Sequence, residues 1–287
     1  MNFLRLLEGM RTPLLNNFFQ FVTYFGQEIL IIAFICTLYW CVNKRFAYLL
    51  GFTYFTAGLC VQALKITFRI PRPWIIDPAF QPVESAVSAA TGYSFPSGHT
   101  QGAVSLFAPM ALCAKKKKYA ALCVLIFLLV GFSRMYLGVH TPKDVLVSMG
   151  ISLLFSWLVV HFSTFLLDET RHIRQFAVLL ALISFLLCIY ALFMLNADII
   201  EQRYASDCLK ASGAGLGFAL GWYAERTYLN FSVTTTRKYM QVLKVIIGLS
   251  ASFAVKSLIP FVMGNGYVVK MFEYFIENDH KPKANLS

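Results

Sequence analysis

Two histidines stand out in this sequence because each occurs in a short polar stretch between long apolar runs. His99 ends the stretch Pro96-Ser97-Gly98-His99, and His140 opens the stretch "HTPKD". Asp144 follows His140 by four residues, near enough for its carboxylate to hold one imidazole nitrogen and leave the other free. His140, oriented and made more basic by Asp144, therefore suits a nucleophile. His99, with no carboxylate nearby in sequence, suits a general acid.

Three basic residues accompany the histidines, namely Lys65, Arg72 and Arg134. Together with the first N–H groups of a helix that starts at Ser97 and Gly98, they would bind a group with several oxygens and two or more negative charges, such as a phosphate. The plainer alternatives are basic side chains that reach for water at helix ends, and a capped helix start with an incidental histidine. No Asp and Glu cluster suited to magnesium accompanies them, so we expect no metal and no other cofactor, and the cations would neutralise the phosphate.

The elements that hold these residues are predicted to be membrane helices. Of the 287 residues, 58% are hydrophobic and only 14% are charged, whereas soluble domains carry about 25% charged residues. A spanning helix needs about 20 apolar residues, and such runs predict an all-α polytopic membrane bundle with eight spans: 18–42, 46–68, 98–114, 119–137, 145–167, 176–195, 209–228 and 239–261. The segment 261–276 is short and interrupted by "MGNG", so a ninth span there stays open.

Local signals place the polar residues at the ends of these helices. Pro71 and Pro73 end the second span, so Arg72 lies on a stiffened exit. Ser97 is suited to N-cap the third span, and Thr141, which precedes a proline, is suited to begin the fifth. The polar stretches would then lie together at one face of the membrane.

The spacing of these residues also matches a known signature: Lys65-x6-Arg72-Pro73, Pro96-Ser97-Gly98-His99 and Ser133-Arg134-x5-His140-x3-Asp144. It resembles the three motifs of the type 2 phosphatidic acid phosphatase superfamily, in its integral-membrane branch that acts on lipid phosphates. The resemblance covers about residues 20–165 and departs at no motif position. It implies a metal-independent phosphatase with a helical core.

The resemblance also implies a role for each motif residue. His140 would attack phosphorus to form a phosphohistidine, and Asp144 would orient it. His99 would protonate the leaving group and later help to activate the hydrolytic water. The phosphoryl oxygens would be bound by Lys65, Arg72, Ser97, the Gly98 amide and Arg134.

From this resemblance we expect hydrolysis of a lipid phosphate or lipid diphosphate at the extracytoplasmic membrane face. Two other functions would use the same residues: a phosphotransferase with the same intermediate, and a protein that binds or transports lipid phosphates without turnover. Soluble branches, the acid phosphatases and vanadium haloperoxidases, are disfavoured because the motif-bearing helices are too apolar to face water. The expected partners are the lipid substrate and membrane lipids, without nucleic acid, and the sequence sets no oligomeric state.

Basic residues predict the orientation, because loops rich in Lys and Arg stay in the cytoplasm. The side opposite the motifs carries eleven Lys and Arg, among them Lys44, Arg45 and the run Lys115–Lys118, and the motif side carries nine, so by this modest margin the site would face outward. We expect a multi-pass protein of the bacterial cytoplasmic membrane.

The expected division of the chain is an interfacial N-terminal helix, a membrane phosphatase core, additional membrane helices and a polar tail: 1–17, 18–167, 168–277 and 278–287. Residues 74–95 form a long connection, in which we favour a lid over a passive spacer. Glycines recur every four residues in the additional helices and favour close helix packing there: Gly213, Gly217 and Gly221.

Overall fold

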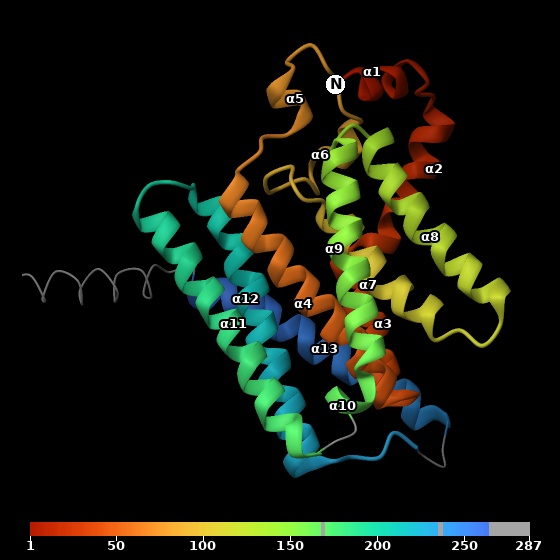
Figure 1. Ribbon diagram of the computed structural model, residues 1–287, viewed down its shortest axis with the longest axis vertical. Helices are drawn as coiled ribbons and strands as arrows, with labels where there is room; N and C mark the ends of the chain where they lie inside the picture. The colour runs from red at the N-terminus through yellow and green to blue at the C-terminus, as the bar shows by residue number, and fades with distance from the viewer. Residues whose placement is uncertain (168–169, 235–237, 264–287) are drawn as a thin grey trace, which may run out of the picture. The chain divides into compact units, whose positions relative to one another are not determined.

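The computed structural model describes residues 1–167, 170–234 and 238–263, and within these ranges every regular element is a helix (Figure 1). The predicted all-α class is therefore confirmed for the described residues. The chain divides into two units, Met1–Thr234 and Thr235–Ser287, and the second is described by α13 (Lys238–Met263). The helices of the first unit are α1 (Asn2–Gly9), α2 (Pro13–Thr23), the 3₁₀ helix η1 (Tyr24–Gly26), α3 (Glu28–Cys41), α4 (Lys44–Phe68), α5 (Pro73–Ile76), α6 (Glu84–Val87), α7 (Gly98–Leu112), α8 (Lys117–Tyr136), α9 (Pro142–His161), α10 (Ser163–Leu167), α11 (Thr170–Asn196), α12 (Gln202–Ala224) and the π-helix η2 (Glu225–Leu229).

Four stretches among the described residues are long and apolar enough to cross a membrane: α4 with α5, α8, α9 and α11. A fifth is added if α2 and α3 form one bent span. Each of the eight predicted ranges contains a helix, but α7 has only 15 residues, so eight spans stay a prediction. Residues 264–276 of the open segment and the tail 278–287 lie outside the described residues.

The first predicted span, 18–42, is interrupted by a bend of 45° between the α2–η1 segment and α3. Gln27, which separates them, has an extended backbone with φ −81° and ψ 134°. A Cβ at Gly26 would lie 2.4 Å from the carbonyl oxygen of His99, so only glycine allows this approach without a shift. The bend therefore places the N-terminal helices directly against a predicted site residue.

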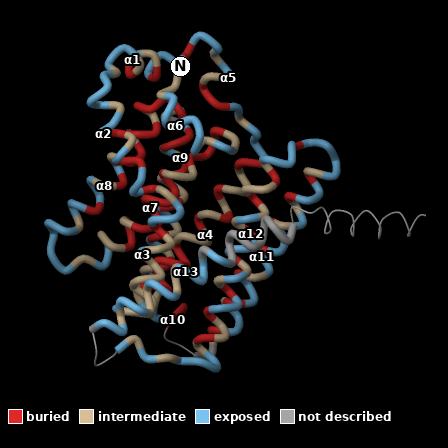
Figure 2. Tube along the Cα trace, turned by 180° about the vertical axis from the view of Figure 1, so that it is seen from behind, coloured by how far each residue is buried: buried red, intermediate tan, exposed pale blue. Residues whose placement is uncertain are grey.

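Helix α4 lies at the centre of the first unit (Figure 1). It packs against α7 and α9 on one side and against α11 and α12 on the other, while α8 packs on α7. Buried residues follow these contacts (Figure 2), and the largest hydrophobic cluster joins Leu59 of α4, Leu180 of α11 and Trp222 of α12. This packing brings the C-terminal end of α4 beside the N-terminal ends of α7 and α9.

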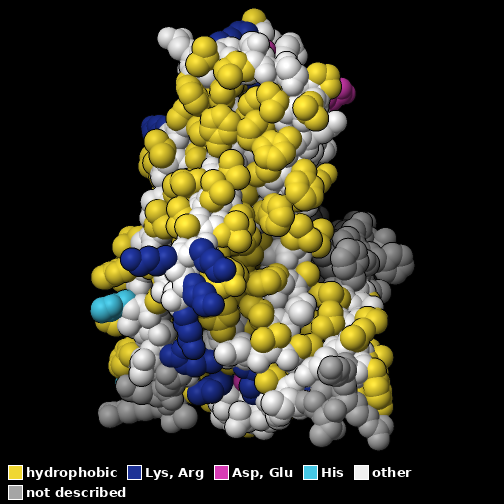
Figure 3. All heavy atoms as spheres, turned by 90° about the vertical axis from the view of Figure 1, so that its right-hand side faces the viewer, with side chains coloured by type: hydrophobic (Ala, Val, Ile, Leu, Met, Phe, Trp, Pro, Cys, Tyr) yellow, Lys and Arg dark blue, Asp and Glu magenta, His cyan; other side chains and the backbone are white. Residues whose placement is uncertain are grey.

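One face of the protein is covered by hydrophobic side chains, with Lys and Arg side chains gathered toward its lower part (Figure 3). Helix α8 contributes exposed Leu122, Leu125 and Leu128 to the apolar surface. The turn between α7 and α8 and the first residues of α8 carry the exposed run Lys115–Lys118. An apolar belt beside a basic end is the surface expected of a helix that contacts lipid and ends at a charged membrane interface.

Within the predicted N-terminal helix, 1–17, the structure has α1 over Asn2–Gly9, which buries Leu4 and Leu7, and α2 begins at Pro13. Arg5 of this helix forms an ion pair with Asp77, with 2.7 Å between Nη2 and Oδ2. The helices of the connection 74–95 are the short α5 and α6. Because Asp77 belongs to this connection, its ion pair with Arg5 joins α1 to the connection. The membrane-surface position of α1 and the lid role of the connection stay predictions.

The predicted glycine contacts in α12 are wrong. A Cβ at any of these three glycines would meet no atom of the described residues within 4 Å: Gly213, Gly217 and Gly221. The close contact is made instead by Gly215, where a Cβ would lie 2.5 Å from Oγ of Ser184 on α11. The reason is helical phase, because Gly215 shares the buried face of α12 with Ser212 and Ala219.

Candidate active site

The predicted site residues gather where two helices, α4 and α8, end and two others, α7 and α9, begin. Lys65 lies in the last turn of α4, and Arg134 lies in the last turn of α8. Ser97 is the N-cap of α7 and Asp144 lies in the first turn of α9. His140 lies in the turn between α8 and α9. Residues that are far apart in sequence thus meet at one end of the bundle.

His140 and Asp144 form the buried centre of this cluster, with exposed fractions of 2% and 1%. His140 Nδ1 lies 3.6 Å from Asp144 Oδ2, a contact slightly longer than a hydrogen bond. The same carboxylate oxygen accepts hydrogen bonds from Ser94 Oγ at 2.6 Å and from the Thr141 amide at 2.8 Å. The Thr141 contact closes the capping box of α9, so the helix start fixes the carboxylate that faces the imidazole.

Burial is the main cause that lowers the pKa of His140 well below its ordinary value of 6.5, and the Arg72 charge lowers it further. Asp144 raises the pKa, in the expected direction, but burial and the Arg72 charge outweigh it. A neutral imidazole with its proton on Nδ1, facing Asp144, leaves a lone pair on Nε2. That is the form a nucleophilic histidine requires.

Arg72 links the histidine to the surrounding backbone. Its Nη1 lies 3.0 Å from His140 Nε2 and donates to the carbonyl oxygen of Val139 at 2.9 Å. Its Nε donates to the carbonyl oxygen of Gly92 at 2.8 Å. Pro73 occupies the first position of α5, directly after Arg72, so the predicted stiff exit is present. The guanidinium is thereby held beside the nitrogen that would react.

Lys65 and Arg134 supply two further buried cations. Lys65 Nζ donates to the carbonyl oxygen of Tyr93 at 2.8 Å, which uses one of its three N–H groups. Arg134 Nη1 donates to Thr23 Oγ1 at 2.8 Å, while its buried Nε and Nη2 have no hydrogen-bond partner in the described part of the chain. Buried charged donors without a partner are costly, and an anion would satisfy them.

The start of α7 contributes the remaining predicted residues. Ser97 Oγ accepts hydrogen bonds from the amide and the hydroxyl of Thr100, at 3.4 Å and 2.9 Å, which confirms the predicted N-cap. Gly98 leaves open space where a Cβ would be. The Ser97 amide donates to the backbone carbonyl oxygen of Asp144 at 3.1 Å, so the first turn of α7, which carries His99, lies beside the start of α9. All eight predicted residues therefore belong to one cluster.

Several residues of this cluster were missed by the sequence reasoning. Thr23 lies 111 residues before its partner Arg134, and Ser94 lies 50 residues before Asp144. Neither belongs to the three motifs, and a lone Ser or Thr in a sequence carries no signal for such a contact. Across the residues that the structure describes, no group of three or more His, Cys, Asp or Glu could hold a metal ion.

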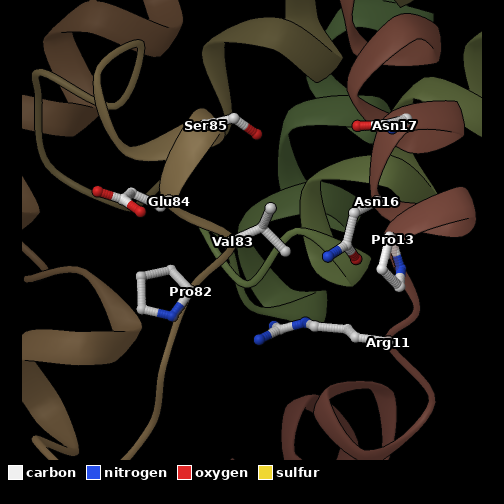
Figure 4. Close-up of a pocket in the computed structure, with 8 residues that line it drawn as sticks. All are labelled: Arg11, Pro13, Asn16, Asn17, Pro82, Val83, Glu84 and Ser85. Atoms are coloured by element: carbon white, nitrogen blue, oxygen red, sulfur yellow. The ribbon is translucent and has the colours of Figure 1, made fainter.

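A separate pocket of about 450 Å³ lies between the start of α2 and residues 82–85 (Figure 4). None of the predicted site residues lines it. Arg11 extends across it, and its Nε donates to the carbonyl oxygen of Tyr136 at 3.1 Å. Gly138, two residues before His140, has a φ of +78° and packs against Arg11, so this arginine supports the turn that carries the histidine.

Two family models match the chain. Residues 46–168, which include all three motifs, match the PAP2 superfamily. Residues 209–277 match the transmembrane extension of PAP2 superfamily phosphatases. The chain belongs to the PAP2 superfamily. This is the type 2 phosphatidic acid phosphatase family that the motifs resemble, and the second match accounts for helices that the resemblance did not reach.

The relatives of this PAP2 protein include phosphatases of membrane lipids. It is 33% identical over 111 residues to undecaprenyl-diphosphatase BcrC of Bacillus subtilis, and the match covers 38% of this chain and 54% of that protein. It is 28% identical over 177 residues to phosphatidylglycerophosphatase B of the same organism, covering 58% and 82%. The crystal structure of a transmembrane PAP2 type phosphatidylglycerolphosphate phosphatase from Bacillus subtilis has 26% identity and a TM-score of 0.48, covering 56% of this chain and 82% of that one.

Proposed function

We propose that this PAP2 protein is a metal-independent phosphatase that hydrolyses a lipid phosphate or lipid diphosphate through a phosphohistidine at His140. One observation carries the proposal: the buried His140 has Asp144 at one ring nitrogen and Arg72 at the other. A structural histidine in an apolar core would not need a carboxylate and a guanidinium together. The names of its relatives support a lipid substrate.

Substrate binding would place the phosphoryl oxygens among Lys65, Arg72 and Arg134, with Ser97 and the Gly98 amide at the start of α7. Arg134 has two buried nitrogens, Nε and Nη2, for this purpose, and Lys65 has two N–H groups beyond the one that Tyr93 uses. Arg72 now faces His140 Nε2, so it would turn its donor to a phosphoryl oxygen and free that nitrogen. Three cations would balance the charge that metal ions balance in other phosphatases.

In the first chemical step, His140 Nε2 attacks phosphorus and the bond from phosphorus to the leaving oxygen breaks. His99 gives a proton to that oxygen, which departs as a lipid alcohol or a lipid phosphate. Asp144 stabilises the positive charge on the phosphorylated imidazole. In the second step, water gives a proton to His99 and attacks phosphorus, the P–N bond breaks, and orthophosphate leaves with His140 restored.

The outward orientation is supported by the separation of the site and the basic run, which lie at opposite ends of α7 and α8. The site lies where α4 and α8 end and α7 and α9 begin. The run Lys115–Lys118 lies at the opposite ends of α7 and α8. Because basic loops favour the cytoplasm, the site would face outward, and bacterial relatives are consistent with a bacterial cytoplasmic membrane.

The test is phosphate release by purified protein in detergent with a chelator. The panel would contain undecaprenyl diphosphate, phosphatidylglycerol phosphate, phosphatidic acid, sphingosine phosphate and a soluble sugar phosphate. We expect release from at least one lipid by the natural chain and by His161→Gln, a change at the far end of α9, and none by His140→Gln.

A trapping experiment with ³²P-labelled substrate then tests the intermediate. We expect an acid-labile, base-stable label on the protein that His140→Gln abolishes. Full activity of His140→Gln would overturn the mechanism. Transfer of the label to an added alcohol in place of water would indicate a phosphotransferase, and binding without release would indicate a binding protein.

A further inference from the structure

The segment of Thr91, Gly92, Tyr93 and Ser94 lies outside the three motifs but contacts residues from two of them. The carbonyl oxygen of Gly92 accepts from Arg72 Nε, and that of Tyr93 accepts from Lys65 Nζ, both at 2.8 Å. Ser94 Oγ donates to Asp144 Oδ2 at 2.6 Å. The position of this 91–94 segment therefore decides where two phosphate-binding cations and the carboxylate behind the nucleophile point.

The 91–94 segment is held from its other side by α12, a helix outside the matched PAP2 core. The ring of Tyr204 stacks on the ring of Tyr93, with 3.9 Å between centroids and 14° between planes. Asp207 Oδ2 accepts a hydrogen bond from Thr91 Oγ1 at 2.8 Å, across 116 residues of sequence. Tyr204 and Asp207 lie three residues apart and so share one face of α12.

The contacts of Asp207 point toward the site more than toward solvent. A Cβ at Gly92 would lie 3.4 Å from Asp207 Oδ2 and 4.0 Å from Lys65 Nζ, so the carboxylate and the ammonium flank the same glycine. The ion pair of Asp207 with Lys210 is longer, at 3.5 Å, and the Lys210 side chain is 75% exposed. An exposed pair of this kind contributes little. The Thr91 contact is also at the surface but is shorter, at 2.8 Å, and Asp207 has the stacked ring of Tyr204 beside it on the same face of α12.

We infer that Tyr204 and Asp207 are positioning residues, through which α12 fixes the 91–94 segment and thereby Lys65 and Arg72 in the phosphate site. The inference rests on the proposed function and extends it, because it makes the additional C-terminal helices part of the phosphate site. Loss of either contact would let the carbonyl oxygens of Gly92 and Tyr93 move. The cations would then bind phosphate less tightly, while the capping box of α9 would still hold Asp144 beside His140.

The test measures inhibition of lipid phosphate hydrolysis by inorganic phosphate, the product, in the full-length protein. We expect Asp207→Ala and Thr91→Val each to raise the inhibition constant of phosphate roughly fivefold, the effect of one lost hydrogen bond. The double variant should match the single variants, because both remove the same contact. Its inhibition constant should not be the product of two separate effects.

Matched variants separate positioning from folding. Tyr204→Phe keeps the stacked ring and should behave as the natural chain, whereas Tyr204→Ala should weaken phosphate inhibition. Gln202→Ala changes an exposed residue two positions before Tyr204 on α12 and should alter nothing. The inhibition constant should change much more than the thermal midpoint and kcat. A purely structural role would give the opposite result, because it would lower the fraction of active protein and leave the inhibition constant unchanged.

The outcomes also separate this inference from the proposed function. If the natural chain hydrolyses a lipid phosphate and the inhibition constants of Asp207→Ala and Tyr204→Ala equal its own, the inference is wrong and the proposed function stands. If effects of Thr91→Val and Asp207→Ala multiply, their contact does not transmit the effect and the inference is also wrong. If the natural chain releases no phosphate, the proposed function fails and the inference fails with it.

Discussion

Two histidines divide the proposed chemistry because their surroundings differ. His140 is enclosed, with Asp144 and Arg72 at its two ring nitrogens. His99 is half-buried at the first turn of α7, where Gly98 leaves open space beside it. An enclosed, oriented imidazole is suited to attack, and a more accessible one is suited to exchange protons with a leaving group and with water.

The role of His99 predicts a dependence on the leaving group. A lipid alcohol needs a proton to leave, whereas nitrophenolate does not. We therefore expect His99→Asn to slow lipid hydrolysis by about 10²–10⁴-fold, but to slow far less the initial burst of nitrophenolate from p-nitrophenyl phosphate. His140→Asn should abolish both. Equal slowing of the two substrates by His99→Asn, measured in rapid-mixing experiments, would contradict the role of general acid.

The lowered pKa of His140 predicts how stability changes with pH. The unfolded chain binds a proton at this histidine as pH falls below 6.5, while the folded protein does not, since burial and Arg72 hold its pKa well below that value. The contribution of His140 to stability is therefore fully present above pH 6.5. It falls below that pH, by at most about 1.4 kcal/mol per pH unit. His140→Asn should reduce the loss of thermal midpoint between pH 7 and pH 5.5, and exposed His161→Asn should not.

At the scale of elements, the site depends on where helices begin, end and approach one another. The helix ends could be predicted because their signals are local: Ser97 and Thr141 both cap as expected. The contacts between helices could not, because Thr23 and Asp207 reach partners 111 and 116 residues away. Neither composition nor periodicity specifies such a pairing. Each contact forms only when its helix, α2 or α12, packs against the rest of the first unit.

The close approach of η1 to α7 gives a prediction for Gly26. A methyl group there would lie 2.4 Å from the carbonyl oxygen of His99, so Gly26→Ala must displace the start of α7. We expect a loss of about 1–3 kcal/mol of stability and slower phosphate release. Gly150→Ala on α9 is the control, since open space surrounds that glycine. Unchanged activity and thermal midpoint in Gly26→Ala would show that η1 does not position His99.

Helix α12 shows why a glycine pattern alone is a weak guide to packing. The four-residue spacing favours Gly217 as a contact, but the buried face of α12 carries Gly215, which meets Ser184 and also Leu59 of α4. Gly215→Ala should lower the thermal midpoint, by a loss of about 1–3 kcal/mol. Gly217→Ala should be neutral or slightly stabilising, because alanine favours helices. A larger loss of thermal midpoint in Gly217→Ala than in Gly215→Ala would support the contacts predicted from the glycine spacing.

At the scale of the whole molecule, the proposed chemistry requires the site and the basic run Lys115–Lys118 to lie on opposite sides of a membrane. The first unit meets this requirement by its connectivity, because α7 and α8 run from the site to the basic turn and back. Length and apolar character support four or five spans among the described residues. The side of the membrane on which each end lies follows only from charge, so it needs a direct measurement.

Cysteine labelling in intact cells gives that measurement, and the chain already contains a suitable marker. Cys113 is exposed and lies two residues before the basic run, so it should react with a membrane-impermeant maleimide only after permeabilisation. Ser88→Cys, introduced at an exposed position after α6 on the site's side of the protein, should react in intact cells in a Cys113→Ser background. Labelling of Cys113 in intact cells would place the basic run outside and the site in the cytoplasm. The enzyme would then act on lipid phosphates of the inner leaflet, and the outward orientation would be wrong while the proposed chemistry remained.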